Sequence, residues 1–169
     1  MKNNVFLKYL DAVQSIINCH EFINYKKAFN KFQKIIIIGN GGSNSIASHI
    51  SQDMTKFHNK KSLSFSDPSM LTCFINDFGM SNAYVKFLNF YSDKKTLVIL
   101  ISSGGESKNI VNSVRFLEKK NISYGVLTGF KKNNKVRTIS KKALFNFHVD
   151  SKSYGVVECT HQIFLHGII

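Results

Sequence analysis

The sequence predicts an α/β fold in which a doubly wound, mostly parallel five-stranded sheet is flanked by helices. Two observations support this prediction. Short runs of Ile, Val and Leu end abruptly in glycine or serine turns at 34–43 and 96–107, and a similar run occupies 122–130. Segments with helical spacing of apolar residues separate such runs. Strands that alternate with helices through short connections form parallel sheets covered on both faces.

The segment before the first strand predicts two helices. Apolar residues from Val5 to Ile17 recur at helical spacing and cover one broad face. We therefore expect 1–32 to form a helical hairpin. The stretch KIIIIGNGGS at 34–43 predicts a fully buried parallel strand that turns directly into a helix over 44–57.

Weaker signals complete the sheet and its helices. Strands fit 62–65 and 144–149, which are short and rich in β-formers. The remaining predicted helices are at about 67–76, where Asp-Pro-Ser supplies the cap, at 107–119 and at 156–169. One proline and no linker-like tract interrupt the chain. We expect a single domain over 1–169, with its α/β core at 33–169.

The formal net charge of +13 has two readings. Clustered cations would favour a nucleic-acid surface. The charge is nearly all lysine, with only Arg115 and Arg137 able to make bidentate contacts, and the lysines are spread from Lys2 to Lys152. A solvated lysine-rich surface explains this spread better, so we expect no nucleic-acid partner. The same field would steer a small anionic substrate toward the protein.

No apolar run approaches the ~20 residues that a membrane span requires, and the first residues lack a signal-peptide pattern. We therefore expect no membrane association and a cytoplasmic location. Cys19, Cys73 and Cys159 show no paired metal-type spacing and lie in segments that are otherwise apolar and helical. They are expected to be reduced thiols in or near the core.

Polar turns follow two of the predicted buried strands. The first, 39–43, combines glycines that allow close backbone approach with two polar side chains. The second, 102–107, offers hydroxyl and amide donors suited to the three oxygens of a phosphate. The candidate binding residues are Asn40, Gly41, Gly42 and Ser43 in the first turn and Ser102, Ser103 and Ser107, with Gly104 and Gly105, in the second.

Each turn alone is also explained as a tight loop. Neither is a nucleotide-binding motif, because none ends in Gly-Lys-Ser/Thr and Gly39-Asn40-Gly41 lacks the third glycine of a dinucleotide fingerprint. Both turns follow strands whose carboxyl ends meet at one edge of the sheet, next to helix N-termini that attract anions. Their combination predicts one shared site.

Four stretches carry a resemblance to a known family: IGNGGSNSIASHISQDM at 38–54, SFSDPSMLTCFINDFG at 64–79, ISSGGESKNI at 101–110 and LTG at 127–129. Through them the chain resembles the sugar isomerase (SIS) family, and within it the phosphoheptose (sedoheptulose 7-phosphate) isomerases. The likeness runs nearly end to end. It implies a flavodoxin-like SIS domain and a homotetramer with sites at subunit interfaces.

The resemblance also implies an activity. It is the conversion of sedoheptulose 7-phosphate into D-glycero-D-manno-heptose 7-phosphate, for lipopolysaccharide or capsule synthesis. This reaction moves a proton between adjacent carbons through an enediol, so it needs an acid/base pair and stabilisation of oxyanion charge. The resemblance assigns proton transfer to Asp53 and His166, substrate contacts to Asn76, Asp77 and Glu158 besides the two turns, and one zinc ion to His49, Asp53, Glu158 and His166.

The residues alone leave part of this assignment open. His49 and Asp53 stand at i and i+4, which suits a metal or acid/base pair but equally a surface helix contact. On the last helix, spacing alone would pair Glu158 with His161 at i+3, because Glu158 and His166 are about 80° out of alignment by the helical period. His161 has either a packing or a catalytic role.

Several residues depart from the family pattern. Asp53 replaces the usual Glu, Glu158 replaces Gln, and Gly104 replaces the middle serine of the phosphate turn. These changes keep open a second class of function, a non-catalytic SIS module that binds a sugar phosphate or a protein, similar to a replication-initiation regulator. Retention of His49, Asp53 and His166 favours the enzyme, whereas the change from Glu to Asp at position 53 favours the regulator.

Overall fold

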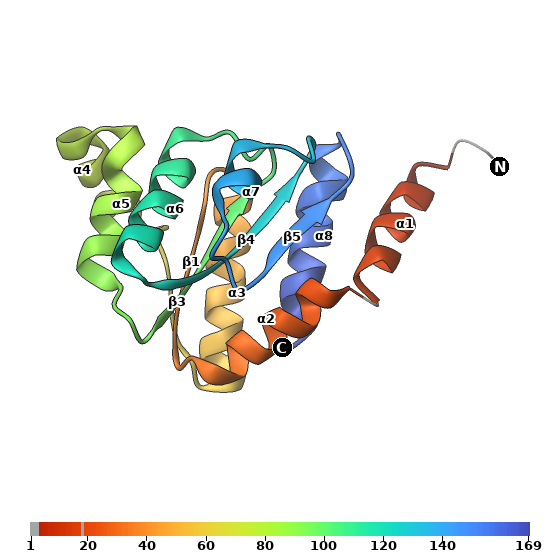
Figure 1. The fold of residues 1–169 in the computed structure, drawn as a ribbon, viewed down its shortest axis with the longest axis horizontal. Coiled ribbons are helices and arrows are strands. Elements are labelled where there is room, and N and C mark those ends of the chain that lie inside the picture. The colour runs from red at the N-terminus through yellow and green to blue at the C-terminus, as the bar shows by residue number, and fades with distance from the viewer. Residues whose placement is uncertain (1–3, 18) are drawn as a thin grey trace.

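The computed structural model describes residues 4–17 and 19–169. In chain order its elements are α1 (Val5–Ile17), α2 (His20–Lys31), β1 (Lys34–Gly39), α3 (Gly42–His58), β2 (Lys61–Ser64), α4 (Pro68–Phe78), α5 (Met80–Tyr91), β3 (Thr96–Ser102), α6 (Lys108–Lys120), β4 (Ser123–Gly129), α7 (Lys135–Ile139), β5 (Asn146–Val149) and α8 (Tyr154–His166). The strands form one parallel sheet in the order β2-β1-β3-β4-β5 (Figure 1). This doubly wound order confirms the predicted fold class.

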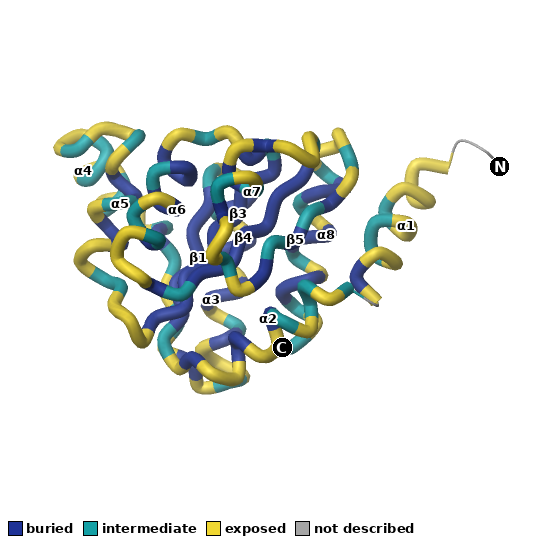
Figure 2. The backbone as a smooth tube through the Cα atoms, viewed as in Figure 1, coloured by how far each residue is buried: buried dark blue, intermediate teal, exposed yellow. Residues whose placement is uncertain are grey.

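The sheet lies between two apolar layers because its central strands are apolar on both sides. In β1, Ile35 and Ile37 pack into one core with α2, α3 and α8, and Ile36 and Ile38 pack into the other with α5 and α6. All four side chains are fully buried. The buried strands form the centre of the molecule and exposed residues its rim (Figure 2). This double burial explains why the strands could be recognised as short apolar runs.

Two side chains, one on α2 and one just before β2, fix the periphery of the sheet. The Glu21 carboxylate accepts a hydrogen bond of 2.6 Å from the backbone N–H of Asn146 on the edge strand β5. Lys60, just before β2, donates to the carbonyls of Phe29 and Phe32 at 2.8 and 3.0 Å. The ammonium therefore satisfies carbonyls at the end of α2 that lack a partner within the helix.

Several details differ from the expectations. Helices α5 and α7 were not predicted, and α8 begins at Tyr154 rather than at residue 156. Helix α1 extends outward from the body and packs on α8 (Figure 1). The predicted core location is wrong for Cys73 and Cys159, which are exposed because they lie on the outward faces of α4 and α8; Cys19 is half-buried. Within residues 4–17 and 19–169, no helix is long and apolar enough to cross a bilayer.

Candidate active site

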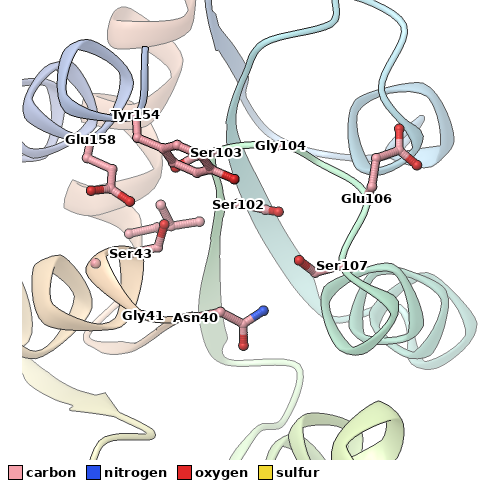
Figure 3. Close-up of a pocket in the computed structure, with 12 residues that line it drawn as sticks. Asn40, Gly41, Ser43, Ser102, Ser103, Gly104, Glu106, Ser107, Tyr154 and Glu158 are labelled. Carbon is pink, nitrogen blue, oxygen red and sulfur yellow. The ribbon is translucent and has the colours of Figure 1, made fainter. Parts of the chain in front are cut away.

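The two polar turns meet in a cavity of about 400 Å³ at the carboxyl ends of β1 and β3 (Figure 3). The cavity is lined by Asn40, Gly41, Gly42, Ser43, Ile101, Ser102, Ser103, Gly104, Glu106, Ser107, Tyr154 and Glu158. Of the nine turn residues named as candidates, all except Gly105 are in this set. No lysine or arginine belongs to it among the described residues. An anion in this cavity would therefore rely on hydroxyl and amide donors.

The first turn is held in place by hydrogen bonds that the sequence did not reveal. The hydroxyl of Tyr84 donates to the carbonyl of Gly39 at 2.7 Å and to Oδ1 of Asn40 at 2.8 Å. The amide of Asn109 donates to the same Oδ1 at 2.8 Å. Burial raises the pKa of Tyr84 to about 12, so its hydroxyl stays a neutral donor near neutral pH. Asn40 thus links the turn to α5 and α6.

The second turn presents free hydroxyl groups to the cavity. Ser103 is 5% exposed, and its buried Oγ has no hydrogen-bond partner among the described residues. Ser107 precedes the first turn of α6 without using its side chain as a cap. An unpaired buried hydroxyl next to a helix N-terminus is a ready donor for phosphate oxygens. The hydroxyl of Ser102 already has a partner, since its Oγ accepts a hydrogen bond of 3.2 Å from the N–H of Gly105.

Two glycines of this second turn differ in what they require. Gly105 has φ +67°, and a Cβ there would overlap the side chain of Asn134. Only glycine fits this position. At Gly104 a Cβ would meet one atom, Cδ2 of Phe130, at an ordinary contact distance of 3.8 Å. The turn can therefore hold a serine at 104, although this chain has none.

A second group of polar residues forms where α3 crosses α8. Oδ2 of Asp53 lies 3.4 Å from Nε2 of His49 and 3.3 Å from Nε2 of His166. The imidazole rings lie 5.1 Å apart, between centroids, at an interplanar angle of 66°. The Asp53 side chain is 13% exposed, compared with 49% for His49 and 34% for His166. Helix α3 positions the first two residues one turn apart, and the C-terminal end of α8 adds the third.

This group fits a metal ion. One donor atom from each of the three residues lies within 4.8 Å of the other two. Two imidazoles and a carboxylate are donors that Zn²⁺ accepts, and three protein ligands leave a coordination position open, as in catalytic zinc sites. The chemistry of the donor set therefore suits zinc, without Glu158.

Glu158 lies outside that group and lines the cavity between the two polar turns. It also lines an adjoining cavity of about 410 Å³ together with Gly42 and His49. A Cβ on Gly42 would lie 2.6 Å from Oε2 of Glu158, so the carboxylate rests on the backbone at the start of α3. Among the described residues its carboxylate has no hydrogen bond. Glu158 thus connects the cavity with the neighbourhood of His49.

Three predicted or candidate residues lie outside both the cavity and the group of His49, Asp53 and His166. Asn76 and Asp77 are exposed on α4 and bonded to each other, with Nδ2 of Asn76 donating to Oδ1 of Asp77 at 3.0 Å. His161 is fully buried, and its Nε2 donates to the carbonyl of Thr128 at 3.0 Å. Burial lowers the pKa of His161 to about 4. This environment is that of a neutral packing residue rather than an acid/base group.

Two residues of the cavity that carry polar groups were missed by the sequence analysis, besides the apolar Ile101. Tyr154 is the first residue of α8 and packs edge-to-face on Phe130, with 4.7 Å between ring centroids. The available signal was Ser153, which precedes it as the N-cap. Glu106 accepts a hydrogen bond of 3.0 Å from the backbone N–H of Lys135, so its carboxylate is engaged at the start of α7.

Known proteins resemble this chain in sequence and in fold. No family model matches the chain. Phosphoheptose isomerase of Fusobacterium nucleatum is 31% identical over 146 residues, which cover 83% of this chain and 73% of the relative. Phosphoheptose isomerase of Buchnera aphidicola subsp. Acyrthosiphon pisum is 32% identical over 133 residues, 75% of this chain and 69% of the relative.

Solved structures show the same fold. A phosphoheptose isomerase from Neisseria gonorrhoeae superposes with a TM-score of 0.88 at 22% identity, over 96% of this chain and 92% of the other. A phosphoheptose isomerase from Francisella tularensis gives 0.84 at 19% identity, over 99% and 93%. From its sequence relatives and its fold together, the chain belongs to the phosphoheptose isomerase family.

Proposed function

We propose that the protein is an aldose–ketose isomerase that converts sedoheptulose 7-phosphate into D-glycero-D-manno-heptose 7-phosphate. The observation that carries the proposal is the set of residues that line the cavity between the two polar turns. The cavity extends from the free hydroxyls of the second turn to Glu158, which lines a second cavity together with His49. A phosphate held at the first end places the other end of a sugar chain near groups that can move protons. Family membership adds to this support.

Phosphate binding would rest on neutral donors. The Oγ atoms of Ser103 and Ser107 and the N-terminal amides of α6 are the free donors of the second turn. Preorganised donors at a helix N-terminus favour a dianion through the helix dipole. No cationic side chain of the described residues lines the cavity. We therefore expect the affinity for phosphate to depend on these hydroxyls and to change little with ionic strength.

Zinc is part of the proposal. His49, Asp53 and His166 would hold it; Glu158, which the sequence analysis expected as a further ligand, lies outside this group of three. When bound, the ion would polarise the substrate carbonyl and stabilise negative charge on its oxygen. The proton-transfer roles predicted for Asp53 and His166 stay predictions. Asn40 and Ser43 would orient sugar hydroxyls beside them.

Assembly and setting are also proposals. We infer a homotetramer in which a neighbouring subunit completes the site, and Asn76 and Asp77 would then act in a neighbour's cavity. Apolar side chains exposed on α1, such as Phe6 at 68% and Leu10 at 63%, support contacts between subunits. The cytoplasm is the proposed location, and lipopolysaccharide or capsule heptose is the proposed use of the product.

The test is an assay of purified protein with sedoheptulose 7-phosphate, in the presence of zinc or of a chelator, with aldose formation followed by NMR. Turnover supports the isomerase. Calorimetric binding of the sugar phosphate without turnover in any metal condition would instead support a non-catalytic sugar-phosphate-binding module. Absence of both binding and turnover would contradict both functions.

A further inference from the structure

We propose that Glu158 is the carboxylate that removes and returns the substrate proton, while Asp53 is a positioning residue for His49 and His166. The inference rests on the proposed isomerase function. It gives the carboxylate part of the chemistry to a different side chain from the one expected from the sequence. The grounds are the contacts of the two carboxylates and their places relative to the cavity.

The Asp53 carboxylate contacts two imidazoles and is largely buried. Its Oδ2 lies 3.3 and 3.4 Å from the Nε2 atoms of two imidazoles, and its side chain is 13% exposed. Asp53 is not one of the described residues that line the two cavities. A carboxylate in this position can orient the imidazoles and balance their charge. It cannot approach a carbon atom of a ligand in the cavity without releasing them.

The Glu158 carboxylate has the opposite surroundings. It lines both cavities, and it makes no hydrogen bond to the described residues. It rests on Gly42, where any side chain would meet it at 2.6 Å. A general base has to reach its proton at hydrogen-bond distance, and geometry decides this before pKa does. Glu158 therefore meets the first requirement and Asp53 does not.

The lining of the cavity suits the two ends of a sugar 7-phosphate. Figure 3 shows Glu158 and Ser107 on opposite sides of the cavity. In a 7-phosphate the reacting carbons C1 and C2 are at the far end of the carbon chain from the phosphate. A phosphate bound at Ser103 and Ser107 thus directs C1 and C2 toward Glu158.

The proposed step balances within the substrate and one carboxylate. Glu158 takes a proton from C1 of the ketose, and the electron pair of the broken C–H bond forms the C1–C2 double bond of an enediolate. The resulting carboxylic acid returns the proton to C2. The hydroxyl proton passes from O1 to O2, so that C1 becomes the aldehyde carbon. No redox partner or leaving group is required.

The departures from the family pattern at Asp53 and at Glu158 are then related. Asp53 is shorter than glutamate by one bond, about 1.5 Å, which leaves its carboxylate with the imidazoles. Glu158 supplies at the cavity the carboxylate that a longer residue 53 would otherwise supply. On this reasoning Asp53→Glu combined with Glu158→Gln moves the base back to α3.

The experiment measures exchange of the substrate C1 proton for deuterium in D₂O by NMR, which detects proton removal even without net turnover. Glu158→Gln keeps the size of the side chain and removes its basicity, so exchange should fall about 100-fold or more, with calorimetric affinity for sedoheptulose 7-phosphate within about threefold. The double variant Asp53→Glu/Glu158→Gln should recover part of the rate. Asp150→Asn, which removes an exposed carboxylate that does not line the cavity, is the matched control and should exchange like the wild type.

Asp53→Asn should retain measurable exchange and shift the imidazole ¹⁵N signals of His49 and His166, whereas Glu158→Gln should leave those signals in place. A rate of exchange in Glu158→Gln equal to that of the wild type overturns the role of Glu158 and leaves the proposed function standing. Loss of exchange in Asp53→Asn with unchanged imidazole signals overturns the positioning role. A wild type that neither exchanges nor turns over overturns the proposed function together with this inference.

Discussion

Nε2 of His166 lies 3.3 Å from Oδ2 of Asp53, although 113 residues separate them in the chain. The contact joins the middle of α3 to the end of α8 at one side of the sheet. His49, one turn before Asp53, contacts the same oxygen at 3.4 Å. Because one carboxylate oxygen orients both imidazoles, the three side chains are expected to respond as a unit to substitution.

Removal of one imidazole should therefore weaken metal binding strongly. In His166→Gln the zinc dissociation constant should rise by a factor of about 10 to 100 or more, because a ligand is lost and Asp53 loses a partner. Competition with a fluorescent chelator measures this. The matched control is His20→Gln, at an exposed position on α2. Equal zinc affinity in the two variants would remove the metal role from His166.

A serine at 104 should improve phosphate binding. The site has room, since a Cβ there contacts only Cδ2 of Phe130 at 3.8 Å. One more hydroxyl donor is worth about 1 kcal/mol, or about fivefold in affinity. Calorimetry of Gly104→Ser with inorganic phosphate and with sedoheptulose 7-phosphate measures the gain. Unchanged affinity for both ligands would show that the phosphate does not lie against residue 104.

Gly105→Ala is the contrasting variant in the same turn. Position 105 has φ +67°, and the added Cβ would overlap the side chain of Asn134. The left-handed conformation costs an alanine about 1 kcal/mol before the overlap is counted. Thermal unfolding should therefore show a lowered Tm, with weaker phosphate binding. A Tm equal to that of the wild type would contradict the strain described for this turn.

The sequence predicts the fold well because the central strands are buried on both faces. The Ile35–Ile38 run fills two cores at once, so it is apolar without interruption and ends at a glycine turn. Helix α5 escapes this kind of analysis because it begins after Gly79 with no capping side chain. Helix α7 has five residues, too few to establish a helical period.

The candidate site could be predicted only where its geometry is local. The spacing of His49 and Asp53 within one helix implies their proximity. The position of His166 beside them, and of Glu158 away from them, depends on where α8 crosses α3. Helical period alone could not decide this, because Glu158 and His166 occupy different faces of α8. Tertiary packing therefore separates a group of metal-type ligands from a carboxylate at the cavity.

Loss of the Tyr84 hydroxyl should loosen the first turn. Tyr84→Phe removes the donor to the Gly39 carbonyl and to Oδ1 of Asn40 and leaves a buried acceptor unsatisfied. The free energy of unfolding should fall by about 1–3 kcal/mol. Urea unfolding measures this change. Tyr91→Phe, on the same helix, is the control; equal losses in the two variants would contradict a specific role for the Tyr84 hydroxyl.

The buried His161 should make the protein less stable in acid. Burial lowers its pKa in the folded state to about 4, whereas the unfolded chain has the ordinary value of 6.5. As pH falls through 6.5, His161 binds a proton in the unfolded state, whereas in the folded state it binds one only near pH 4. Stability contributed by neutral His161 is thus complete above about pH 7 and declines between 6.5 and 4. A shift of about 2.5 units corresponds to at most about 3 kcal/mol at the low end of this window.

Urea unfolding at pH 7.5, 6.0 and 5.0 measures this dependence. The variant His161→Gln cannot titrate but retains an amide that can donate to the carbonyl of Thr128, the partner of Nε2 at 3.0 Å. It should be less stable than the wild type at pH 7.5, because its packing against Phe147 is altered. The difference between the two proteins should narrow as pH falls, since only the wild type loses stability through residue 161. Parallel pH profiles would mean that His161 titrates normally in the folded protein, and the core around Thr128 would then have to admit an imidazolium.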